Sequence, residues 1–360
     1  MKKWFRYIIY VLIVSAVCAF FILEGGQLTE EEDIAEEDYF TANVDDIQNN
    51  EIVGSDKKIA CWGDSITFGL GSSIAVIHND DEIIDVSGWS YTEALSYYTG
   101  LDVYNLGVCG ETSYEIALRQ GGIKMYIDRT VTVKPGKRVR INIIDENGAT
   151  VMLENFNGYQ TNNDDVDNVV YINNIPFVIS YGKDYMYISL CGNNNNQSVR
   201  INKGSRVITK AEHDIQSDIV IIQMGSNGGW DSYEELINQY KAMIANSGTQ
   251  CYIIIGDTDN PDESIDSSKY ETGTDVGLNE TFWEAALREE FGEHFINMRT
   301  YLLENAFEIS GLEADEDDLY NISQGRVPEI IKEDYTHLNS YGYYVMGVAV
   351  YEKGLELGYW

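Results

Sequence analysis

The 360-residue sequence predicts an α/β protein with a parallel sheet, helices on both faces and an inserted all-β domain. Two observations predict this class. Continuous apolar runs rich in Ile and Val, typical of strands covered on both faces, alternate with segments of helical spacing. Between about residues 120 and 213 this alternation stops, and short β segments separated by turn sequences replace it. An apolar segment and an acidic segment precede both regions.

The N-terminal segment predicts a membrane anchor. Lys2, Lys3 and Arg6 precede an uncharged apolar run, residues 7–23, that is just long enough to span a bilayer. Basic residues remain on the cytoplasmic side, so we expect the rest of the chain to be extracellular. Residues 1–23 are therefore predicted to form an uncleaved anchor helix. The alternative is a cleaved signal peptide and a secreted protein.

Residues 24–56 are acidic and polar without apolar periodicity, which predicts a flexible linker. The whole chain carries 24 basic and 59 acidic residues, a formal net charge of −35. A surface of this charge repels phosphate backbones and anionic lipid head groups. We therefore expect no nucleic-acid partner, and contact with a membrane only through the N-terminal helix. The sequence carries no signal for an oligomeric state.

From residue 57 the chain predicts strands alternating with helices. The expected strands lie at residues 57–62, 102–109, 218–224, 251–257 and 294–298. Thr112 and Glu115 have the T-x-x-E spacing of a capping box that opens a helix. Further helices are expected at 232–248, 279–293 and 339–358, the first of them ending at Gly248.

The inserted domain, residues 119–213, is predicted to be all-β and sandwich-like. Its segments alternate apolar and polar residues and are separated by turn sequences such as Pro135-Gly136 and Asn147-Gly148. The α/β domain is thus expected in two parts, residues 57–118 and 214–360.

The five cysteines form no CxxC pair, which excludes a zinc ribbon and a disulfide-dense scaffold. Cys61 and Cys109 each lie near the end of an expected strand; two buried thiols are favoured over a disulfide between them, and pairing stays open. The histidines His78, His213 and His294 have no clustered carboxylates or cysteines around them in the sequence. We expect neither a metal nor an organic cofactor.

Residues that could take part in one reaction follow several of the expected strands. Ser65 follows the first strand, Gly110 the second and Asn227 the third, while Asp334 and His337 precede the closing helix. In an open parallel sheet the loops beyond the carboxyl ends of the strands form the ligand site. Singly, these residues are ordinary turn, cap or surface residues. As an ordered set they favour one shared site.

Acyl transfer to a serine needs the groups that this set contains. The hydroxyl needs a general base, and the base needs a carboxylate that holds its tautomer. Donors must point at the oxyanion that develops. His337 and Asp334, three residues apart, supply base and acid. The backbone N–H groups of Ser65 and Gly110 and the side-chain amide of Asn227 supply three donors.

The segments GDSIT, NLGVCGETS, MGSNG and DYTHLN resemble the four sequence blocks of the SGNH hydrolases, also called the GDSL esterase/lipase family. The resemblance covers residues 57–118 and 214–360. It implies a flavodoxin-like three-layer α/β/α sandwich with a five-stranded parallel sheet.

The resemblance also implies roles for individual residues. Ser65 would be the nucleophile, His337 the base and Asp334 its partner, while Ser65, Gly110 and Asn227 would form the oxyanion hole. Asp64 in such blocks supports the loop and is not the triad acid. The sequence departs from the blocks at two places. Ile66 replaces the usual Leu, a tolerated change, and Gly228 replaces the usual Asp, which we expect to loosen the loop.

These features imply an exported serine esterase that hydrolyses carboxylic esters through an acyl-serine intermediate. The expected substrates are small O-acyl groups, such as acetyl, on a carbohydrate or cell-wall polymer. One alternative is an O-acyltransferase with the same triad. Another is a carbohydrate-binding surface protein on a degenerate hydrolase scaffold. Trp89 and Trp230 are candidates for stacking on sugar rings, although packing in the core is the favoured interpretation.

Overall fold

The computed structural model describes residues 56–79, 82–157, 168–182, 185–192, 197–258 and 280–360. The predicted anchor, residues 1–23, and all but the last residue of the predicted linker lie outside these ranges. Within the described ranges no helix combines the length and the apolar character that crossing a membrane requires.

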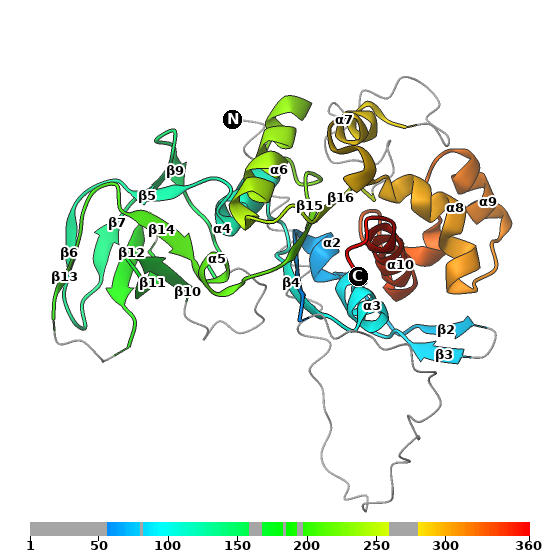
Figure 1. Cartoon of the computed structure of the whole chain (residues 1–360), viewed down its shortest axis with the longest axis horizontal. Helices are drawn as coiled ribbons and strands as arrows, with labels where there is room; N and C mark the ends of the chain where they lie inside the picture. Colours follow the sequence, from blue (N-terminus) through cyan, green and yellow to red (C-terminus); the bar gives the residue numbers. More distant parts are fainter. Residues whose placement is uncertain (1–55, 80–81, 158–167, 183–184, 193–196, 259–279) are drawn as a thin grey trace, which may run out of the picture. The chain divides into compact units, whose positions relative to one another are not determined.

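A five-stranded parallel sheet forms the centre of the α/β region (Figure 1). From one edge to the other its strands are β4 (Asp102–Gly107), β1 (Lys58–Gly63), β15 (Ile219–Gln223), β16 (Tyr252–Ile255) and β17 (Phe295–Ile296). All four pairings are parallel. In chain order the strands run 2-1-3-4-5, the flavodoxin-like arrangement. The prediction of an α/β fold with five parallel strands is confirmed, and each strand overlaps its expected range.

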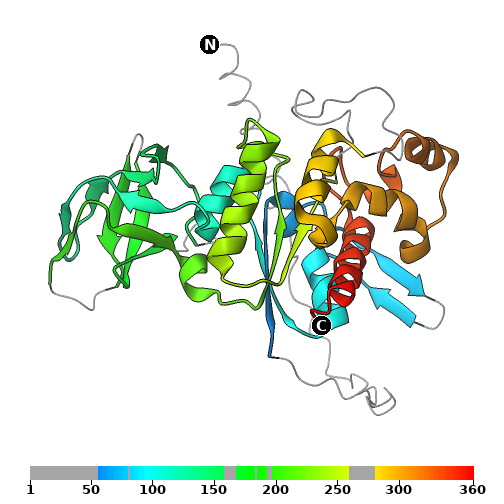
Figure 2. The ribbon, with the colours of Figure 1, turned by 45° about the horizontal axis from the view of Figure 1, so that its top comes forward.

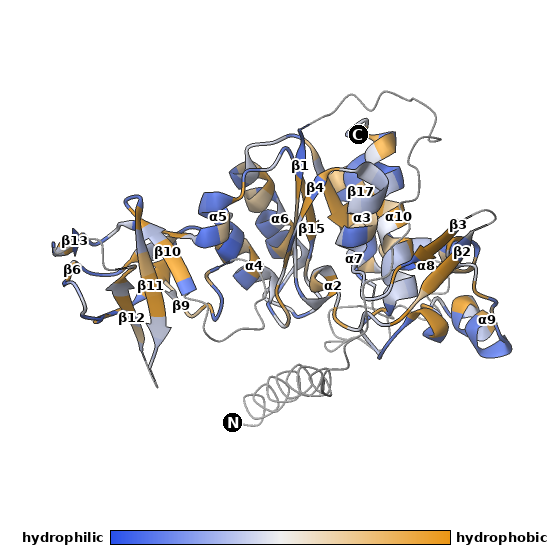
Figure 3. Ribbon diagram, turned by 90° about the horizontal axis from the view of Figure 1, so that it is seen from below, coloured by the Kyte–Doolittle hydropathy of each residue, from blue (hydrophilic) through white to orange (hydrophobic). Residues whose placement is uncertain are grey.

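Helices cover both faces of this sheet, as Figure 3 shows for α3 and α10 on one side and α4 and α6 on the other. One layer contains α3 (Tyr91–Thr99), α8 (Met298–Ser310) and α10 (Ser340–Glu356). The other contains α4 (Ser113–Gln120), α6 (Tyr233–Ser247) and α7 (Phe282–Phe291). Shorter elements complete the region: α2 (Ser65–Phe68), α9 (Glu316–Ser323), and the 3-10 turns η1 (Gly292–His294) and η2 (Glu329–Ile331).

The side-chain alternation of β1 explains why the sheet has two cores. Ile59 and Cys61 pack with the layer of α3 and α10, whereas Ala60 and Trp62 pack with α4 and α6. All four residues are buried. Because successive side chains of a strand point to opposite faces, a strand covered on both sides must be apolar throughout. This is the continuous apolar pattern that the sequence shows.

Two local predictions about helix ends are confirmed. The Thr112 side chain accepts a hydrogen bond from Glu115 N at 3.3 Å, and Thr112 N donates to the Glu115 carboxylate at 2.9 Å. The α6 helix ends at Gly248, whose φ of 72° is left-handed. The helices α3, α8 and α9 were not predicted, nor was a short helix at Lys210–Asp214, in a segment that was expected to be all-β.

A β-hairpin between α2 and α3 was also not predicted. It consists of β2 (Val76–Asn79) and β3 (Glu82–Asp85). Ile77 and Ile84, opposite each other in the hairpin, are buried in a small core that includes Tyr344 of α10. The hairpin therefore depends on a contact with the last helix, which a local reading of its sequence does not contain.

The segment between α4 and β15 forms two antiparallel sheets (Figures 1 and 2). The eight-stranded sheet has the order β7-β12-β11-β10-β14-β5-β8-β9, and the two-stranded ribbon pairs β13 with β6. In chain order the strands are β5 (Met125–Ile127), β6 (Val131–Val133), β7 (Val139–Ile141), β8 (Ile143–Asp145), β9 (Thr150–Val151), β10 (Asn168–Ile172), β11 (Ile175–Tyr181), β12 (Met186–Leu190), β13 (Val199–Ile201) and β14 (Arg206–Thr209).

One core joins the two sheets of the insertion. Val133 and Ile201 of the ribbon lie in the same buried cluster as Ile141 and Phe177 of the larger sheet. A short helix, α5 (Lys210–Asp214), then leads the chain back to β15. The Thr209 hydroxyl caps α5 and also donates to the carbonyl of Arg119 at 2.6 Å, which ties the insertion to α4.

Gly107, the last residue of β4, allows α2 to pack closely against the carboxyl end of that strand. A Cβ atom there would lie 2.1 Å from Phe68 N and 2.6 Å from Phe68 Cα. Real Cβ atoms do not approach backbone this closely, so α2 packs directly on the end of β4 only because residue 107 has no side chain. This packing fixes the position of α2, whose first residue is Ser65.

We expect Gly107→Ala to destabilise the fold by about 3 kcal/mol, because α2 must move away from β4. The matched control is Gly248→Ala, where φ is 72° but no atom lies within 4 Å of the added Cβ. There only the left-handed backbone is penalised, at about 1 kcal/mol. Denaturant unfolding measures both. Equal losses for the two variants would contradict the packing argument.

Candidate active site

Ser65 lies at the turn from β1 into α2. The Asp64 carboxylate caps this short helix by accepting a hydrogen bond from Ile66 N at 3.0 Å. Ser65 is the first helical residue and is 7% exposed. The turn thus holds the Ser65 side chain at the carboxyl end of β1, at the edge of the sheet where the loops after the other parallel strands also begin.

His337 contacts Ser65 from the loop before α10, and Asp334 contacts His337 within the same loop. The Nε2 atom of His337 lies 2.9 Å from Ser65 Oγ, and its Nδ1 lies 2.8 Å from Asp334 Oδ2. The other Asp334 oxygen accepts hydrogen bonds from the backbone N–H groups of Thr336, at 2.8 Å, and His337, at 2.7 Å. The structure brings together three side chains that are up to 272 residues apart in sequence.

The hydrogen bonds of Asp334 determine which groups donate and which accept in the contacts between Asp334, His337 and Ser65. Burial by itself raises the pKa of Asp334, but hydrogen bonds from the His337 side chain and backbone and from Thr336 N lower it to about 2. Asp334 is therefore ionised and a hydrogen-bond acceptor at neutral pH. His337 Nδ1 carries the proton and donates this hydrogen bond. In neutral His337, Nε2 is then the acceptor for the Ser65 hydroxyl.

Contacts from the start of α10 hold both sides of this site. The Asn339 side chain caps α10 and donates to the carbonyl of Ile330 at 2.8 Å, which closes the His337 loop. The Ser340 hydroxyl donates to Ser73 O at 2.8 Å, and the Tyr343 hydroxyl donates to Leu70 O at 2.6 Å. The chain segment after α2 is thus fixed to the same helix that carries the His337 loop.

Gly110 and Asn227 also lie at this edge. The Nδ2 atom of Asn227 donates to the carbonyl of Glu111 at 3.1 Å and lies 3.5 Å from Asp64 Oδ2. The loops after β1, β4 and β15 therefore meet at one amide group. Among the described residues no acceptor bonds to the backbone N–H of Ser65 or of Gly110. Both groups are available to a bound oxyanion.

The loop that contains Asn227 is held firmly, contrary to the expectation drawn from Gly228. Gly228 N donates to Gly225 O at 2.9 Å, and its own carbonyl accepts from Ser113 N and Ser113 Oγ, both at 3.0 Å. Gly228 has a φ of 79°, a conformation that a glycine adopts without strain. The expectation of a loosened loop was wrong because backbone contacts to the start of α4 replace the missing side chain.

A buried ion pair beneath the site was not predicted. Arg119 Nε donates to Glu111 Oε2 at 2.6 Å, and Arg119 Nη2 donates to Gly63 O at 3.1 Å. The Arg119 side chain is fully buried and lies over the Trp62 ring. Arg119 therefore links the loop of Ser65 to the loop of Gly110. The signal in the sequence is a Glu directly after Gly110, with an Arg two helical turns later.

Asp64 is an unusual carboxyl group because it is buried next to Ser65. Burial raises the pKa of Asp64 to about 7, against the hydrogen bond from Ile66 N, which lowers it. Asp257, which follows β16 and accepts a hydrogen bond from Ser226 Oγ at 2.9 Å, adds to the increase. Burial likewise raises the pKa of Glu111 to about 7, against the attraction of Arg119.

The remaining sequence candidates form no metal site, disulfide or exposed stacking surface among the described residues. Within the described ranges no group of three or more His, Cys, Asp or Glu side chains has the geometry of a metal site. Cys61 and Cys109 are not joined by a disulfide. Trp230 is a core residue, 5% exposed, whose indole N–H donates to Gly225 O at 2.9 Å. His213 stacks on Tyr171 of the insertion.

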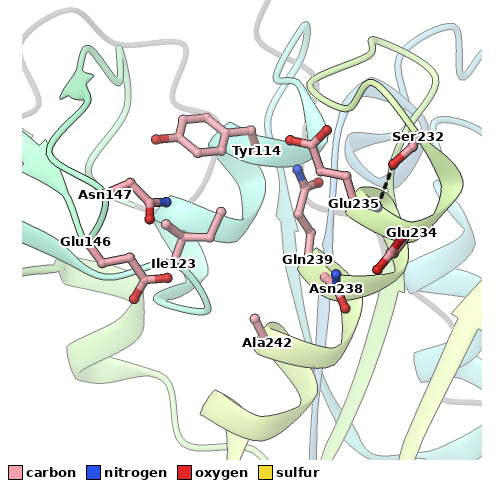
Figure 4. A pocket seen from close by; sticks show the side chains of 10 residues that line it. All are labelled: Tyr114, Ile123, Glu146, Asn147, Ser232, Glu234, Glu235, Asn238, Gln239 and Ala242. Atoms are coloured by element: carbon pink, nitrogen blue, oxygen red, sulfur yellow. Dashed lines mark hydrogen bonds between the residues drawn. The ribbon is translucent and has the colours of Figure 1, made fainter.

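A polar hollow of about 360 Å³ lies beside α4 and α6 (Figure 4). Tyr114, Gln239 and Asn147 contribute to its lining, and neither Ser65 nor His337 does. Gln239 Nε2 donates to Gly229 O at 2.8 Å, which joins one wall of the hollow to the loop of Asn227. The hollow is therefore a neighbour of the candidate oxyanion hole and not the place where Ser65 is exposed.

Comparison with known proteins adds one solved structure. A protein assigned to the G-D-S-L lipolytic family from Desulfitobacterium hafniense DCB-2 aligns with 82% of this chain and 99% of its own, at 13% sequence identity and a TM-score of 0.37. No protein-family model and no curated protein matches the sequence.

The buried Asp64 predicts a pH-dependent difference in stability. Because its folded pKa of about 7 exceeds the ordinary value of 3.8, the protonated form stabilises the fold. This contribution is complete below about pH 4 and is lost as the pH rises to 7. We expect Asp64→Asn, which keeps the acceptor for Ile66 N, to gain stability relative to wild type between pH 5 and pH 8, by about 2 kcal/mol.

Denaturant unfolding at the two pH values measures this difference. The exposed residue Asp231 provides the control, since Asp231→Asn makes the same chemical change outside the buried site. If the free energy of unfolding changes equally between pH 5 and pH 8 in wild type and Asp64→Asn, the assignment of a raised pKa to Asp64 is contradicted.

Proposed function

We propose that the protein is a serine esterase of the SGNH type that hydrolyses carboxylic esters. One observation carries the proposal: Ser65 Oγ lies 2.9 Å from His337 Nε2, while Asp334 accepts a hydrogen bond from Nδ1, the opposite nitrogen of that ring. These distances are those of a nucleophile in contact with its general base, and of a base oriented by a carboxylate.

In the first half of the reaction His337 Nε2 takes the proton of the Ser65 hydroxyl as Oγ forms a bond to the ester carbonyl carbon. The carbonyl oxygen becomes an oxyanion, which the N–H groups of Ser65 and Gly110 and the amide of Asn227 can stabilise. When the tetrahedral intermediate collapses, the C–O bond to the alcohol breaks. His337 donates its Nε2 proton to the departing alkoxide, which leaves an acyl group on Ser65.

In the second half a water molecule takes the place of the alcohol. His337 Nε2 removes its proton as the water oxygen bonds to the acyl carbon, and the same three donors stabilise the second oxyanion. Collapse breaks the bond to Ser65 Oγ, which recovers its proton from His337. The products are a carboxylic acid and the free enzyme. Only protein groups and water take part in this scheme.

The proposal extends to substrate and location. The basic residues before the apolar N-terminal run support an exported, membrane-anchored esterase. An extracellular enzyme meets esters mainly on polymers, which supports small O-acyl groups such as acetyl on a carbohydrate or cell-wall polymer as the substrate.

We expect Ser65→Ala to lower the turnover of p-nitrophenyl acetate at least about 10³-fold, because the acyl-enzyme no longer forms. A fluorophosphonate should add its mass to a peptide containing Ser65 in wild type only, as mass spectrometry would detect. The control Ser323→Ala removes an exposed hydroxyl elsewhere. Undiminished turnover by Ser65→Ala would refute the proposal. Adding an oligosaccharide acceptor to the same assay would reveal transfer if acetate appears on the sugar.

We expect Asn227→Ala to lower kcat about 10²- to 10³-fold with a small change in KM, since the amide acts on an oxyanion that exists only after attack. Asn305→Ala, which removes an amide from α8, is the matched control. Steady-state kinetics with p-nitrophenyl acetate measure both. A rise in KM at unchanged kcat would instead assign Asn227 to binding of the ester.

A further inference from the structure

The charge of the chain is distributed unevenly. Residues 119–213 contain 12 basic and 9 acidic residues, a net charge of +3. The rest of the chain contains 12 basic and 50 acidic residues, a net charge of −38. The two sum to the −35 of the whole chain. A strongly acidic protein therefore carries a β insertion of opposite sign.

The exposed basic residues of the insertion gather on β6, β7, the turn between them and the neighbouring β13, at the end away from α2 (Figure 1). Residues 129–140, which include β6 and most of β7, carry Arg129, Lys134, Lys137, Arg138 and Arg140, all exposed. We call this surface, together with two further residues described next, the basic face.

Two residues of β13 and the turn after it complete the basic face. Arg200 lies opposite Thr132 in the pairing of β13 with β6, and Lys203 N donates to Thr130 Oγ1 at 3.1 Å. Both side chains are exposed. Arg129 Nη2 donates to the carbonyl of Arg140 at 3.0 Å, so the two ends of the segment 129–140 also lie together.

The cations of the basic face are not neutralised by carboxylates of the described residues. None of the seven takes part in an ion pair there. The nearby carboxylate of Asp128 accepts a hydrogen bond from Asn142 Nδ2 at 3.0 Å. Elsewhere the exposed cations Lys241 and Arg288 each contact a glutamate. The seven cations of the basic face thus differ from Lys241 and Arg288, whose charges are paired with carboxylates.

Two arginines of the basic face are held by tyrosine rings. The Arg138 guanidinium lies 4.5 Å from the ring centroid of Tyr187, and that of Arg140 lies 3.1 Å from that of Tyr185. Tyr187 is opposite Arg140 in the pairing of β12 with β7. Stacking on a ring uses the face of a guanidinium and leaves its N–H groups directed outward in the plane, where they can bind a carboxylate or phosphate.

We propose that the basic face binds a polysaccharide that carries carboxylate or phosphate groups. Charge complementarity supports this occupant: seven open cations offer contacts to several anionic groups of one chain, and the −38 of the remaining chain repels that polymer from every other surface. The ordered guanidinium planes give bidentate contacts to such groups.

The same charges favour a glycan over a nucleic acid. Duplex DNA carries one charge per roughly 1.7 Å, so a rod of that density held at the basic face would be repelled strongly by the acidic remainder. A polysaccharide with one charge per sugar or fewer is repelled less and can bend away. The inference deepens the proposed function, on which it rests, because it names an anionic polysaccharide as the carrier of the esters that Ser65 would cleave.

The experiment compares binding of the full chain, in neutral detergent, to fluorescently labelled polysaccharides by anisotropy. Polygalacturonate offers carboxylates, phosphomannan offers phosphates and dextran is uncharged. We expect saturable binding to at least one of the first two, weakened by salt, and none to dextran. Arg138→Gln with Arg140→Gln should weaken binding about tenfold. The control Lys241→Gln with Arg288→Gln, which removes the same charge, should leave it unchanged.

The results that would overturn the proposal differ from those that would support it. Absence of binding to both anionic polysaccharides, equal loss in the control pair, or tighter binding to a 20-base-pair DNA duplex would each overturn the proposal. Hydrolysis of p-nitrophenyl acetate should stay at the wild-type rate in Arg138→Gln with Arg140→Gln, and Ser65→Ala should still bind the polymer. A failure of binding can therefore be distinguished from a failure of the esterase assignment.

Discussion

The parallel pairing of β1 with β4 on one side and β15 on the other places the residues after all three strands at one edge of the sheet. Ser65, Gly110 and Asn227 follow these strands, so strand direction alone brings them near one another. His337 reaches the same edge because the start of α10 is bonded to the segment after α2. The close approach of α2 to Gly107 then fixes where Ser65 lies.

The site contains buried charged groups, and burying a charge costs desolvation free energy. Arg119 and Glu111 are almost completely buried, and removing one member of such a pair typically costs about 3–5 kcal/mol because the other charge stays unpaired. Arg119 offsets this with bonds to Glu111 and to Gly63 O, and these bonds join two loops of the candidate oxyanion hole. Asp64 carries a similar penalty in its raised pKa while it caps the helix of Ser65.

Net charge is a poor guide to the surface of this protein. A value of −35 predicts repulsion of polyanions, yet the described insertion exposes seven cations on β7, β13 and the segments next to them. The opposite signs lie in different parts of the chain and cannot cancel over distances beyond a Debye length, roughly 8 Å at physiological salt. A partner therefore meets local charges and not their average. The whole-chain charge governs long-range encounter, whereas the basic face governs contact.

The amino-acid sequence by itself determined what depends on neighbouring residues: the strand pattern, the Thr112 capping box, the end of α6 and the ordered blocks that contain Ser65 and His337. Only the tertiary structure decided the β2–β3 hairpin, the Arg119 pair, the firm loop at Gly228 and the clustering of the basic face. Each of these depends on contacts between distant segments. Apolar period and capping act within one or two turns of chain, but the partner of a hairpin, a buried charge or a surface cation is fixed only when the sheets and helices pack.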